Sequence, residues 1–518
     1  MIRELVYGLA GVFLLAYVVD YVFSLQDDPR EPRRIRPRFP VIGHVLGLLQ
    51  HGPSYYQKTS EMADAEIYTL AVLNFKVYIS ASSRLLPMIQ KQSKALSFRP
   101  FLQLVARKYG DASPETYDIF GGSLPDDLSH TVKMSLMPGP NLDDLSLRMG
   151  KRVLVDIDAF LQSGKTRLLK WSRHAIVQAT SCAVYGEKHP FQDPEVESAY
   201  WSWMPYLSAH LVGWLDITGK GYALREKVFK AYIKYCGALP AGTSHLMKEH
   251  QRLLDDAGVP PTDKAKQAAI FTIASFSNSA PTLYWTLWEL FSRPDILAQV
   301  RAELVAHAVV RNDDGSGSGS GNNSFTLDVA ALKHHCPLLL SVFQETQRTR
   351  HVNPSFRKVM TDVVLDDKYL LKAGNYLQVP GNVIHGERGI WGAEAAEFDP
   401  YRFVPGHRDA KPNGGGADAS GFVPWGAAPY LCPARQFAAV EIMIVAALLA
   451  LRADLHPVGE DGKEIKWDRN PPLNFSDLST LSPPKKDVPM RITVRQEWAG
   501  KWSLKMGESR SRVPLASG

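Results

Sequence analysis

The chain has 518 residues, of which 45% are hydrophobic and 22% are charged, a composition that excludes wholesale disorder. Lys and Arg number 59 and Asp and Glu number 53, so the formal net charge is +6. This small excess, without a basic stripe interleaved with aromatic residues, gives no reason to expect a nucleic-acid partner. The four cysteines are scattered and form no C-x-x-C pair. Their spacing argues against a disulfide framework and for a reducing compartment.

The first segment, Leu5 to Leu25, is apolar, and its only charge, Asp20, lies near its end. At about 1.5 Å per residue this length matches one bilayer span, and no small-residue cleavage site follows it. We therefore predict an N-terminal transmembrane helix and membrane anchor over residues 1–27; the alternative is a buried core helix. The arginines within residues 30–38, against Arg3 alone before the segment, predict a cytoplasmic catalytic domain. An ordinary solvated basic linker is the plainer interpretation of these arginines.

The next segment, residues 28–45, contains Pro32, Pro37 and Pro40 and is predicted to be a basic, stiff hinge. The remainder, residues 46–518, reads as one catalytic domain without internal repeats.

Within this domain, helical apolar periodicity dominates, and a fold that is mainly α with small β-sheets is expected. The clearest predicted helices are Lys266–Phe291 and Ala434–Leu451. Short strands are predicted at Ile67–Ala71, Val77–Ser80, Val363–Leu365 and Met490–Val494. Two polar, Gly-rich segments, 311–324 and 411–421, are predicted to be surface loops.

The sharpest candidate site is PWGAAPYLCPARQFAAVEIMIVAALLAL, residues 424–451. A Gly/Pro-rich turn presents Cys432 at the start of a long apolar helix, with Pro433 suited to the first helical position. The free N–H groups and dipole of a helix N-terminus lower the pKa of a thiol beside them. An apolar thiolate site of this kind suits a haem iron. Taken alone, however, a single cysteine is more often a buried structural residue.

Two further motifs precede this loop. Glu345 and Arg348 stand one helical turn apart in E-T-Q-R, a pair that is common by itself. FDPYRF, residues 398–403, follows some fifty residues later and precedes the Cys loop. The order E-x-x-R, P-x-R-F and Cys loop resembles the cytochrome P-450 family, and the resemblance extends over essentially the whole chain. It implies that Arg402 joins Glu345 and Arg348 in a buried ion network, which specifies geometry more than it adds stability.

The resemblance implies the cytochrome P-450 fold and a haem b cofactor whose iron takes an axial thiolate from Cys432. It also implies NADPH-cytochrome P-450 reductase as a partner, since no flavin or nicotinamide domain is fused to this chain, and a single-pass location in the endoplasmic reticulum membrane in contact with lipid. Within the family, the chain is most similar to the branch of sterol and bile-acid hydroxylases, prostacyclin synthase and fungal secondary-metabolite enzymes. The similarity lies in PWGAAPYLCPAR and in the predicted central helix, Phe271–Phe291. The implied substrate is a lipophilic small molecule such as a terpenoid, sterol or alkaloid intermediate. The segments Phe98–Val105, Trp201–Trp214 and Leu478–Leu481 are expected to line its pocket.

The chain departs from the family pattern at several positions in the Cys loop. Ala428 and Ala434 replace glycines, which costs about 1 kcal/mol at each position that needs a positive φ. Tyr430 stands where an Arg or His usually meets a haem propionate, and Trp425 belongs to the same cofactor-binding loop.

Other propionate partners are less clear. Arg357 in NPSFRKV fits the family's other propionate arginine, with a surface arginine as the alternative. The usual W-x-x-x-R is absent near residues 128–139, where only His130 and Lys133 are candidates.

The central helix, FTIASFSNSAPTLYWTLWELF, carries the other half of the predicted site. In most monooxygenases of the family an acid and a threonine relay protons to dioxygen; here Ser277 and Asn278 align with them. Pro281 cannot donate to the carbonyl of Ser277, so a kink is expected there. The freed carbonyl, hydroxyl and carboxamide together are suited to hold water beside the iron. The alternative is an ordinary core helix with a kink.

These observations favour a haem-thiolate monooxygenase that uses dioxygen and electrons from NADPH. Two alternatives stay open. The missing acid–Thr pair permits a haem-thiolate isomerase or dehydratase that needs no reductase. The two alanines permit a catalytically degenerate haem-binding protein.

Overall fold

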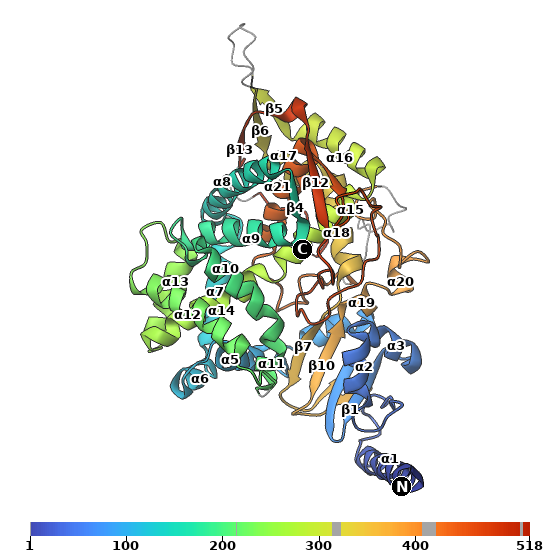
Figure 1. Cartoon of the computed structure of the whole chain (residues 1–518). Helices are drawn as coiled ribbons and strands as arrows, with labels where there is room; N and C mark the ends of the chain where they lie inside the picture. The colour runs from blue at the N-terminus through green and yellow to red at the C-terminus, as the bar shows by residue number, and fades with distance from the viewer. Residues whose placement is uncertain (1, 214, 313–322, 407–420, 508–510, 518) are drawn as a thin grey trace.

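The computed structural model describes residues 2–213, 215–312, 323–406, 421–507 and 511–517, and it divides into a large helical part and a smaller part built around a β-sheet (Figure 1). The α-helices are α1 (Ile2–Ser24), α2 (Gly43–His51), α3 (Ser54–Ala63), α4 (Leu86–Lys91), α5 (Arg99–Lys108), α6 (Pro114–Phe120), α7 (Leu124–Ser135), α8 (Pro140–Ser163), α9 (Leu168–Tyr185), α10 (Pro194–Trp203), α11 (Leu207–Val212), α12 (Lys220–Gly237), α13 (His245–Asp256), α14 (Pro261–Phe276), α15 (Ser279–Phe291), α16 (Pro294–His307), α17 (Val329–His334), α18 (Pro337–Arg350), α19 (Gly381–Ile384), α20 (Arg388–Trp391) and α21 (Arg435–Arg452). The strands are β1 (Ile67–Val72), β2 (Phe75–Ser80), β3 (Leu96–Ser97), β4 (Lys165–Arg167), β5 (Val309–Asn312), β6 (Ser324–Asp328), β7 (Pro354–Val359), β8 (Val363–Leu365), β9 (Tyr369–Leu371), β10 (Tyr376–Pro380), β11 (Ala453–Pro457), β12 (Pro489–Val494) and β13 (Lys501–Lys505).

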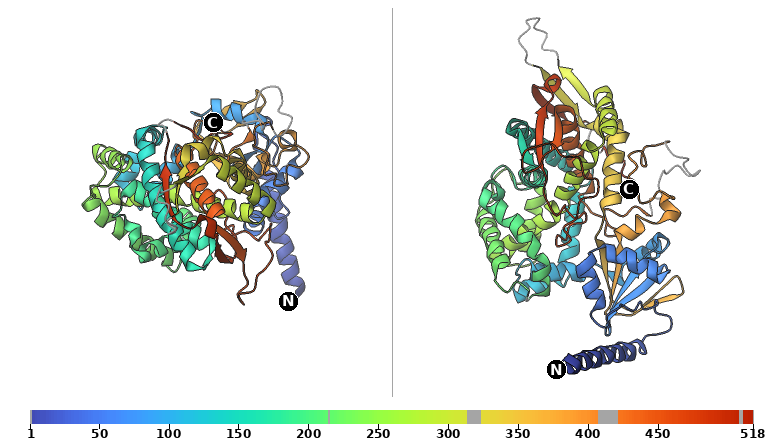
Figure 2. Two further views of the ribbon diagram at one scale, coloured as in Figure 1. Left: turned by 90° about the horizontal axis from the view of Figure 1, so that it is seen from above. Right: turned by 45° about the vertical axis from the view of Figure 1, so that its right-hand side comes forward.

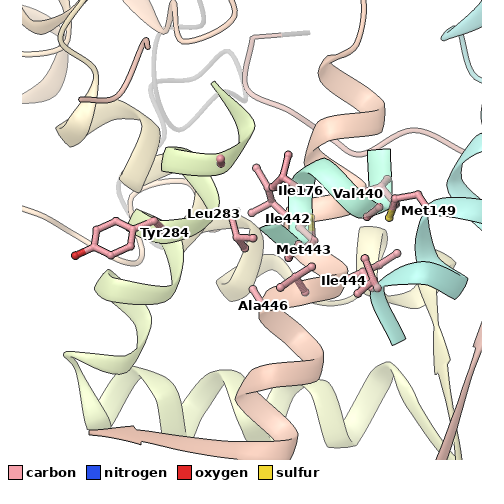
Figure 3. Packing of buried hydrophobic residues seen from close by; sticks show 14 of the residues in the cluster. Met149, Ile176, Leu283, Tyr284, Val440, Ile442, Met443, Ile444 and Ala446 are labelled. Atoms are coloured by element: carbon pink, nitrogen blue, oxygen red, sulfur yellow. The ribbon is translucent and has the colours of Figure 1, made fainter. Parts of the chain in front are cut away.

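The core of the helical part is built around α21. From Gln436 to Arg452 every residue of this helix is buried, because its sequence is apolar on almost all sides. Figure 3 shows its side chains packed against those of α8, α9 and α15, with Met149, Ile176 and Leu283 among the partners. Each fully buried side chain of this size contributes roughly 1.5–3 kcal/mol relative to an exposed one. The helix after Cys432 is therefore held rigidly on every side.

The largest sheet has the strand order β1-β2-β10-β7-β3. Strand β10 pairs in parallel with β2, at Tyr376↔Val77, whereas its other neighbour, β7, is antiparallel, at Leu377↔Arg357. This pairing brings β7, which directly follows α18, into the middle of the molecule. Three smaller sheets have the orders β11-β12-β4, β13-β6-β5 and β8-β9. The prediction of a mainly helical fold with small sheets is confirmed.

The predicted strands coincide with β1, β2, β8 and β12 to within two residues at each end. The predicted loop 311–324 is wrong at its ends. Arg311 and Asn312 belong to β5 and Ser324 to β6, because antiparallel pairing between these strands satisfies their backbone groups. Residues 313–322 of this loop, and 411–420 of the other, lie outside the described residues.

Helix α1 lies apart from the helical body, beside the sheet (Figure 2). Its described apolar side chains face outward; Val12 and Leu14 are both 67% exposed. The alternative of a buried core helix is therefore wrong. In the described part of the chain, no helix has both the length and the apolarity that crossing a membrane requires.

The end of α1 and the predicted hinge are joined to the sheet rather than free. Asp20 is 6% exposed and pairs with Arg34 at 3.5 Å, and Arg34 also pairs with Asp27 at 2.9 Å. The Ile35 N–H donates to the Thr69 carbonyl of β1 at 2.9 Å. Arg34 is thus part of an ion network, not of a solvated basic linker, and residues 33–35 are fixed to the sheet.

Candidate active site

The motif pair in α18 and the segment after α20 meet in a buried ion network. Arg348 donates from Nε and Nη2 to the two carboxylate oxygens of Glu345, both at 2.7 Å. Arg402 donates from Nε to the same oxygens at 3.1 Å. The remaining hydrogens of Arg348 go to backbone carbonyls, among them His385 at 2.8 Å and Ala395 at 2.6 Å. The structure therefore brings the three predicted residues together and uses them to hold the irregular segment that precedes the Cys loop.

Cys432 lies in the turn before α21. Its N–H donates to the Trp425 carbonyl at 2.8 Å, and its own carbonyl accepts from Arg435 Nη1 at 3.2 Å. The helix begins at Arg435, so Pro433 precedes the helix and does not occupy its first position as predicted. Burial raises the pKa of the Cys432 thiol, whereas the Ala434 N–H and Arg435 act in the opposite direction. The lowering expected from a helix terminus is therefore wrong, because burial of the thiol outweighs it.

The two alanines of the Cys loop carry no backbone strain. Ala434 has φ −88°, and in the described residues 421–434 the only positive φ belongs to Gly426, at 81°. Alanine therefore costs nothing in conformation at Ala428 or Ala434.

Arg357 reaches the Cys loop from β7. Its side chain is buried, donates from Nη2 to the Ala427 carbonyl at 3.2 Å, and lies 4.7 Å over the Tyr430 ring. Burial lowers the pKa of Arg357 to about 10. In the described part of the chain no carboxylate pairs with it. The alternative of a surface arginine is wrong: this is a buried cation without a counterion.

Two other groups in the loop bear on the cofactor. The Trp425 indole N–H is buried and has no hydrogen-bond partner among the described residues. The Tyr430 hydroxyl donates to the Ser93 carbonyl at 3.3 Å, and Phe98 lies beside the Tyr430 ring with centroids 6.0 Å apart. A thiol, an unpaired buried cation and an unpaired N–H around one loop fit the iron and the anionic propionates of a haem group.

His130 and Lys133 both lie on α7 with exposed side chains, and among the described residues neither has a hydrogen bond or ion pair to the Cys loop. Their role as propionate partners stays a prediction.

The central helix is broken rather than only kinked. Helix α14 ends at Phe276 and α15 starts at Ser279, leaving Ser277 and Asn278 between them. Pro281 has no N–H for the Ser277 carbonyl, as predicted. The Ser277 hydroxyl donates back to the Ile273 carbonyl at 2.6 Å, so its proton is not directed away from the helix.

Asn278 is exposed, and its carboxamide makes a contact that sequence reasoning did not foresee. Its Oδ1 accepts from the Thr480 N–H at 2.7 Å and from the Thr480 hydroxyl at 2.9 Å. Leu478–Leu481 was expected to line the pocket, but no local pattern linked Thr480 to a residue 202 positions away.

His385 is a second residue that the motifs did not single out. Its Nε2 accepts from the Val423 N–H at 3.0 Å, so the ring proton is on Nδ1, 3.1 Å from the Arg348 carbonyl. Burial lowers its pKa well below the usual value, and it is neutral. This imidazole therefore links α18 to the start of the Cys loop. The sequence signal was limited to one histidine in a Gly-rich run that also contains Glu387 and Arg388.

The chain is similar to known proteins over most of its length. The family model described as cytochrome P-450 matches residues 240–479. The chain is 32% identical over 502 residues to the cytochrome P-450 monooxygenase nodJ of Hypoxylon pulicicidum, covering 95% of both chains. It is 29% identical over 228 residues to 5-beta-cholestane-3-alpha,7-alpha-diol 12-alpha-hydroxylase of Sus scrofa, covering 42% of this chain and 44% of that one.

Solved structures agree on the fold. A retinoic-acid-bound cyanobacterial cytochrome P-450 matches with a TM-score of 0.66 at 17% identity, covering 90% of this chain and 99% of that one. The relative that is 32% identical over 95% of both chains, together with the match to the family model, shows that the chain belongs to the cytochrome P-450 family of haem-thiolate monooxygenases.

Proposed function

We propose that Cys432 is the iron ligand and that the enzyme oxidises a lipophilic small molecule, an intermediate of secondary metabolism such as a terpenoid, sterol or alkaloid. The observation that carries the proposal is the Cys432 loop, fixed between α21 and the buried Glu345 network, with the unpaired cation of Arg357 beside it. The steroid named for the Sus scrofa relative supports a lipophilic substrate.

The chain's own residues have separable tasks in this proposal. Haem, when bound, supplies the oxidation of an unactivated C–H bond with dioxygen and two electrons. Arg357 and the Trp425 N–H would hold the propionates, because the one is a buried cation and the other a buried donor without a partner among the described residues. The backbone hydrogen bonds of Cys432 hold the turn that carries its sulfur. On the side of the proposed haem site opposite Cys432, Asn278 and the Ser277 carbonyl are the polar groups that orient water or substrate.

Electrons are proposed to come from NADPH-cytochrome P-450 reductase. The test is co-expression with such a reductase and an untargeted comparison of metabolites, followed by assay of the purified pair with NADPH. Product that forms only with both reductase and NADPH supports the proposal; product that forms without either contradicts it.

One observation favours a second candidate, a haem-thiolate isomerase or dehydratase. At the helix break a carboxamide, which cannot release a proton as an acid does, replaces the acid–Thr pair. Reductase-independent turnover of an oxygenated substrate identifies this reaction. The degenerate alternative depended on Ala428 and Ala434, and neither has the positive φ that motivated it.

Membrane attachment through α1 is also part of the proposal, at the endoplasmic reticulum with the catalytic domain in the cytoplasm. Outward apolar side chains support it: Leu15 is 63% and Leu25 is 67% exposed on or just after α1, and Leu49 of α2 is 79% exposed. Fractionation with alkaline carbonate extraction tests attachment, and protease protection of both ends tests whether the helix crosses the bilayer.

A further inference from the structure

We propose that Thr480 is a positioning residue that fixes the Asn278 carboxamide so that it presents only N–H donors to the active site. The inference rests on the proposed function, in which the break between α14 and α15 faces the iron. It assigns Thr480 a role and narrows the chemistry of the ligand that Asn278 recognises.

The orientation of the carboxamide follows from its two partners. A backbone N–H pairs only with the oxygen of an amide, so the 2.7 Å contact with the Thr480 N–H identifies Oδ1 and excludes the flipped amide. The Thr480 hydroxyl, at 2.9 Å, occupies the second acceptor position of the same oxygen. Both lone pairs of Oδ1 are thereby engaged.

Thr480 is itself held from the other side. Its carbonyl accepts from the N–H groups of Val352, at 2.9 Å, and Asn353, at 3.4 Å, just after α18. The Asn353 side chain donates to the Ser479 carbonyl, and His351 forms an antiparallel bridge with Leu481. The loop at 479–481 is therefore fixed to the segment between α18 and β7, and it transmits this rigidity to the helix break.

What remains available on Asn278 is its Nδ2 group. No acceptor pairs with Nδ2 in the described part of the chain, although the residue is exposed. Two N–H hydrogens without a partner are suited to an acceptor oxygen, such as a keto, ether or hydroxyl oxygen of a substrate or the oxygen end of a bound diatomic ligand. They are not suited to a donor, so Asn278 selects for acceptors.

The experiment measures the C–O stretch of the ferrous carbon monoxide complex by infrared spectroscopy, a readout independent of turnover. A donor near the oxygen of bound carbon monoxide lowers this frequency, whereas a lone pair there raises it. We expect Asn278→Ala to shift the band upward, and Asn278→Asp at alkaline pH, which keeps both Thr480 contacts but replaces the donors by an acceptor, to shift it further. Thr480→Val, which keeps the side-chain shape and removes the hydroxyl, should broaden the band and shift it part of the way.

Two variants serve as controls. Thr480→Ser retains the hydroxyl and should restore the wild-type band. Thr326→Val makes the same substitution in β6, where the hydroxyl contacts Ser503 at 2.9 Å and not Asn278, and it should leave the band unchanged.

The outcomes distinguish failure of the proposed function from failure of the positioning role of Thr480. If Asn278→Ala leaves the band unchanged, the break does not face the ligand and the distal part of the proposed function fails. If Asn278→Ala shifts the band but Thr480→Val does not, or if Thr326→Val shifts it equally, Thr480 has no positioning role and only the further inference fails.

Discussion

The Glu345 network and the helix break differ in how completely their polar groups are paired. Around Glu345, all five N–H hydrogens of the Arg348 guanidinium have acceptors, and the carboxylate accepts from Arg348, Arg402 and the backbone. At the break, the Asn278 Nδ2 group has no acceptor in the described residues, and Pro281 leaves the Ser277 carbonyl without its helical donor. The fully paired side specifies geometry, whereas the partly paired side keeps groups available for ligands.

The largest effect is expected at Cys432 itself. Cys432→Ser removes the proposed thiolate, and it should abolish the red-shifted Soret band of the ferrous carbon monoxide complex. Absorbance difference spectra measure this directly. Retention of the band would show that another residue is the ligand.

Breaking the paired side should cost stability. Glu345→Ala leaves two arginines buried without their counterion, at roughly 3–5 kcal/mol. We expect little haem-loaded protein and a lower melting temperature. The matched control is Glu66→Ala, which removes a carboxylate from an exposed pair with Arg84 at 2.6 Å; it should cost only about 0.2–1 kcal/mol. If Glu345→Ala and Glu66→Ala lowered the melting temperature equally, the buried network would be no more important for stability than an exposed pair.

Breaking the partly paired side should affect chemistry instead. Asn278→Ala should leave the melting temperature nearly unchanged while product falls by roughly one to two orders of magnitude. NADPH is still consumed and peroxide rises, because oxygen activation is no longer coupled to substrate oxidation. Asn278→Thr should partly restore coupling. Unchanged coupling and yield in Asn278→Ala would make this an ordinary broken core helix.

The neutral histidines near Arg348 give the paired side a pH dependence. Burial lowers the pKa of His351 to about 4, while in the unfolded chain a histidine titrates near 6.5. As the pH falls, the unfolded state therefore binds the proton before the folded state does. The contribution of this one group to the free energy of unfolding is complete above pH 6.5 and is lost between pH 6.5 and 4, by about 1.4 kcal/mol per pH unit. Urea unfolding at several pH values measures how the free energy of unfolding changes with pH. In His351→Gln this slope should be smaller by the contribution of one proton.

The smallest effect is expected at the N-terminus. Deleting residues 2–18 retains Asp20, whose ion pair with Arg34 joins the helix end to the sheet. The truncated protein should move in part to the soluble fraction with its haem spectrum unchanged. Extending the deletion through residue 24 removes Asp20 and leaves Arg34 with Asp27 as its partner, so a slightly lower melting temperature is expected.

Local patterns predicted much of this molecule because they act over a few residues. The largely apolar run after Cys432 is sufficient for a buried helix, and the missing N–H of Pro281 is sufficient to disrupt the helix before it. The meeting of Glu345, Arg348 and Arg402 was predicted from motif order, since resemblance to a family carries three-dimensional information that spacing does not.

Only the tertiary structure decided the rest. Whether Ala434 is strained, whether the Cys432 thiol is more or less acidic than usual, and whether Arg357 has a counterion all depend on groups brought together from distant segments. The sequence determined that a carboxamide stands at the helix break. Its partnership with Thr480, and hence the donor face that it presents, depends on a loop 202 positions away that is held there by the residues after α18. Hydrogen bonds between such distant segments leave no periodicity in the chain, because folding and not local propensity brings their partners together.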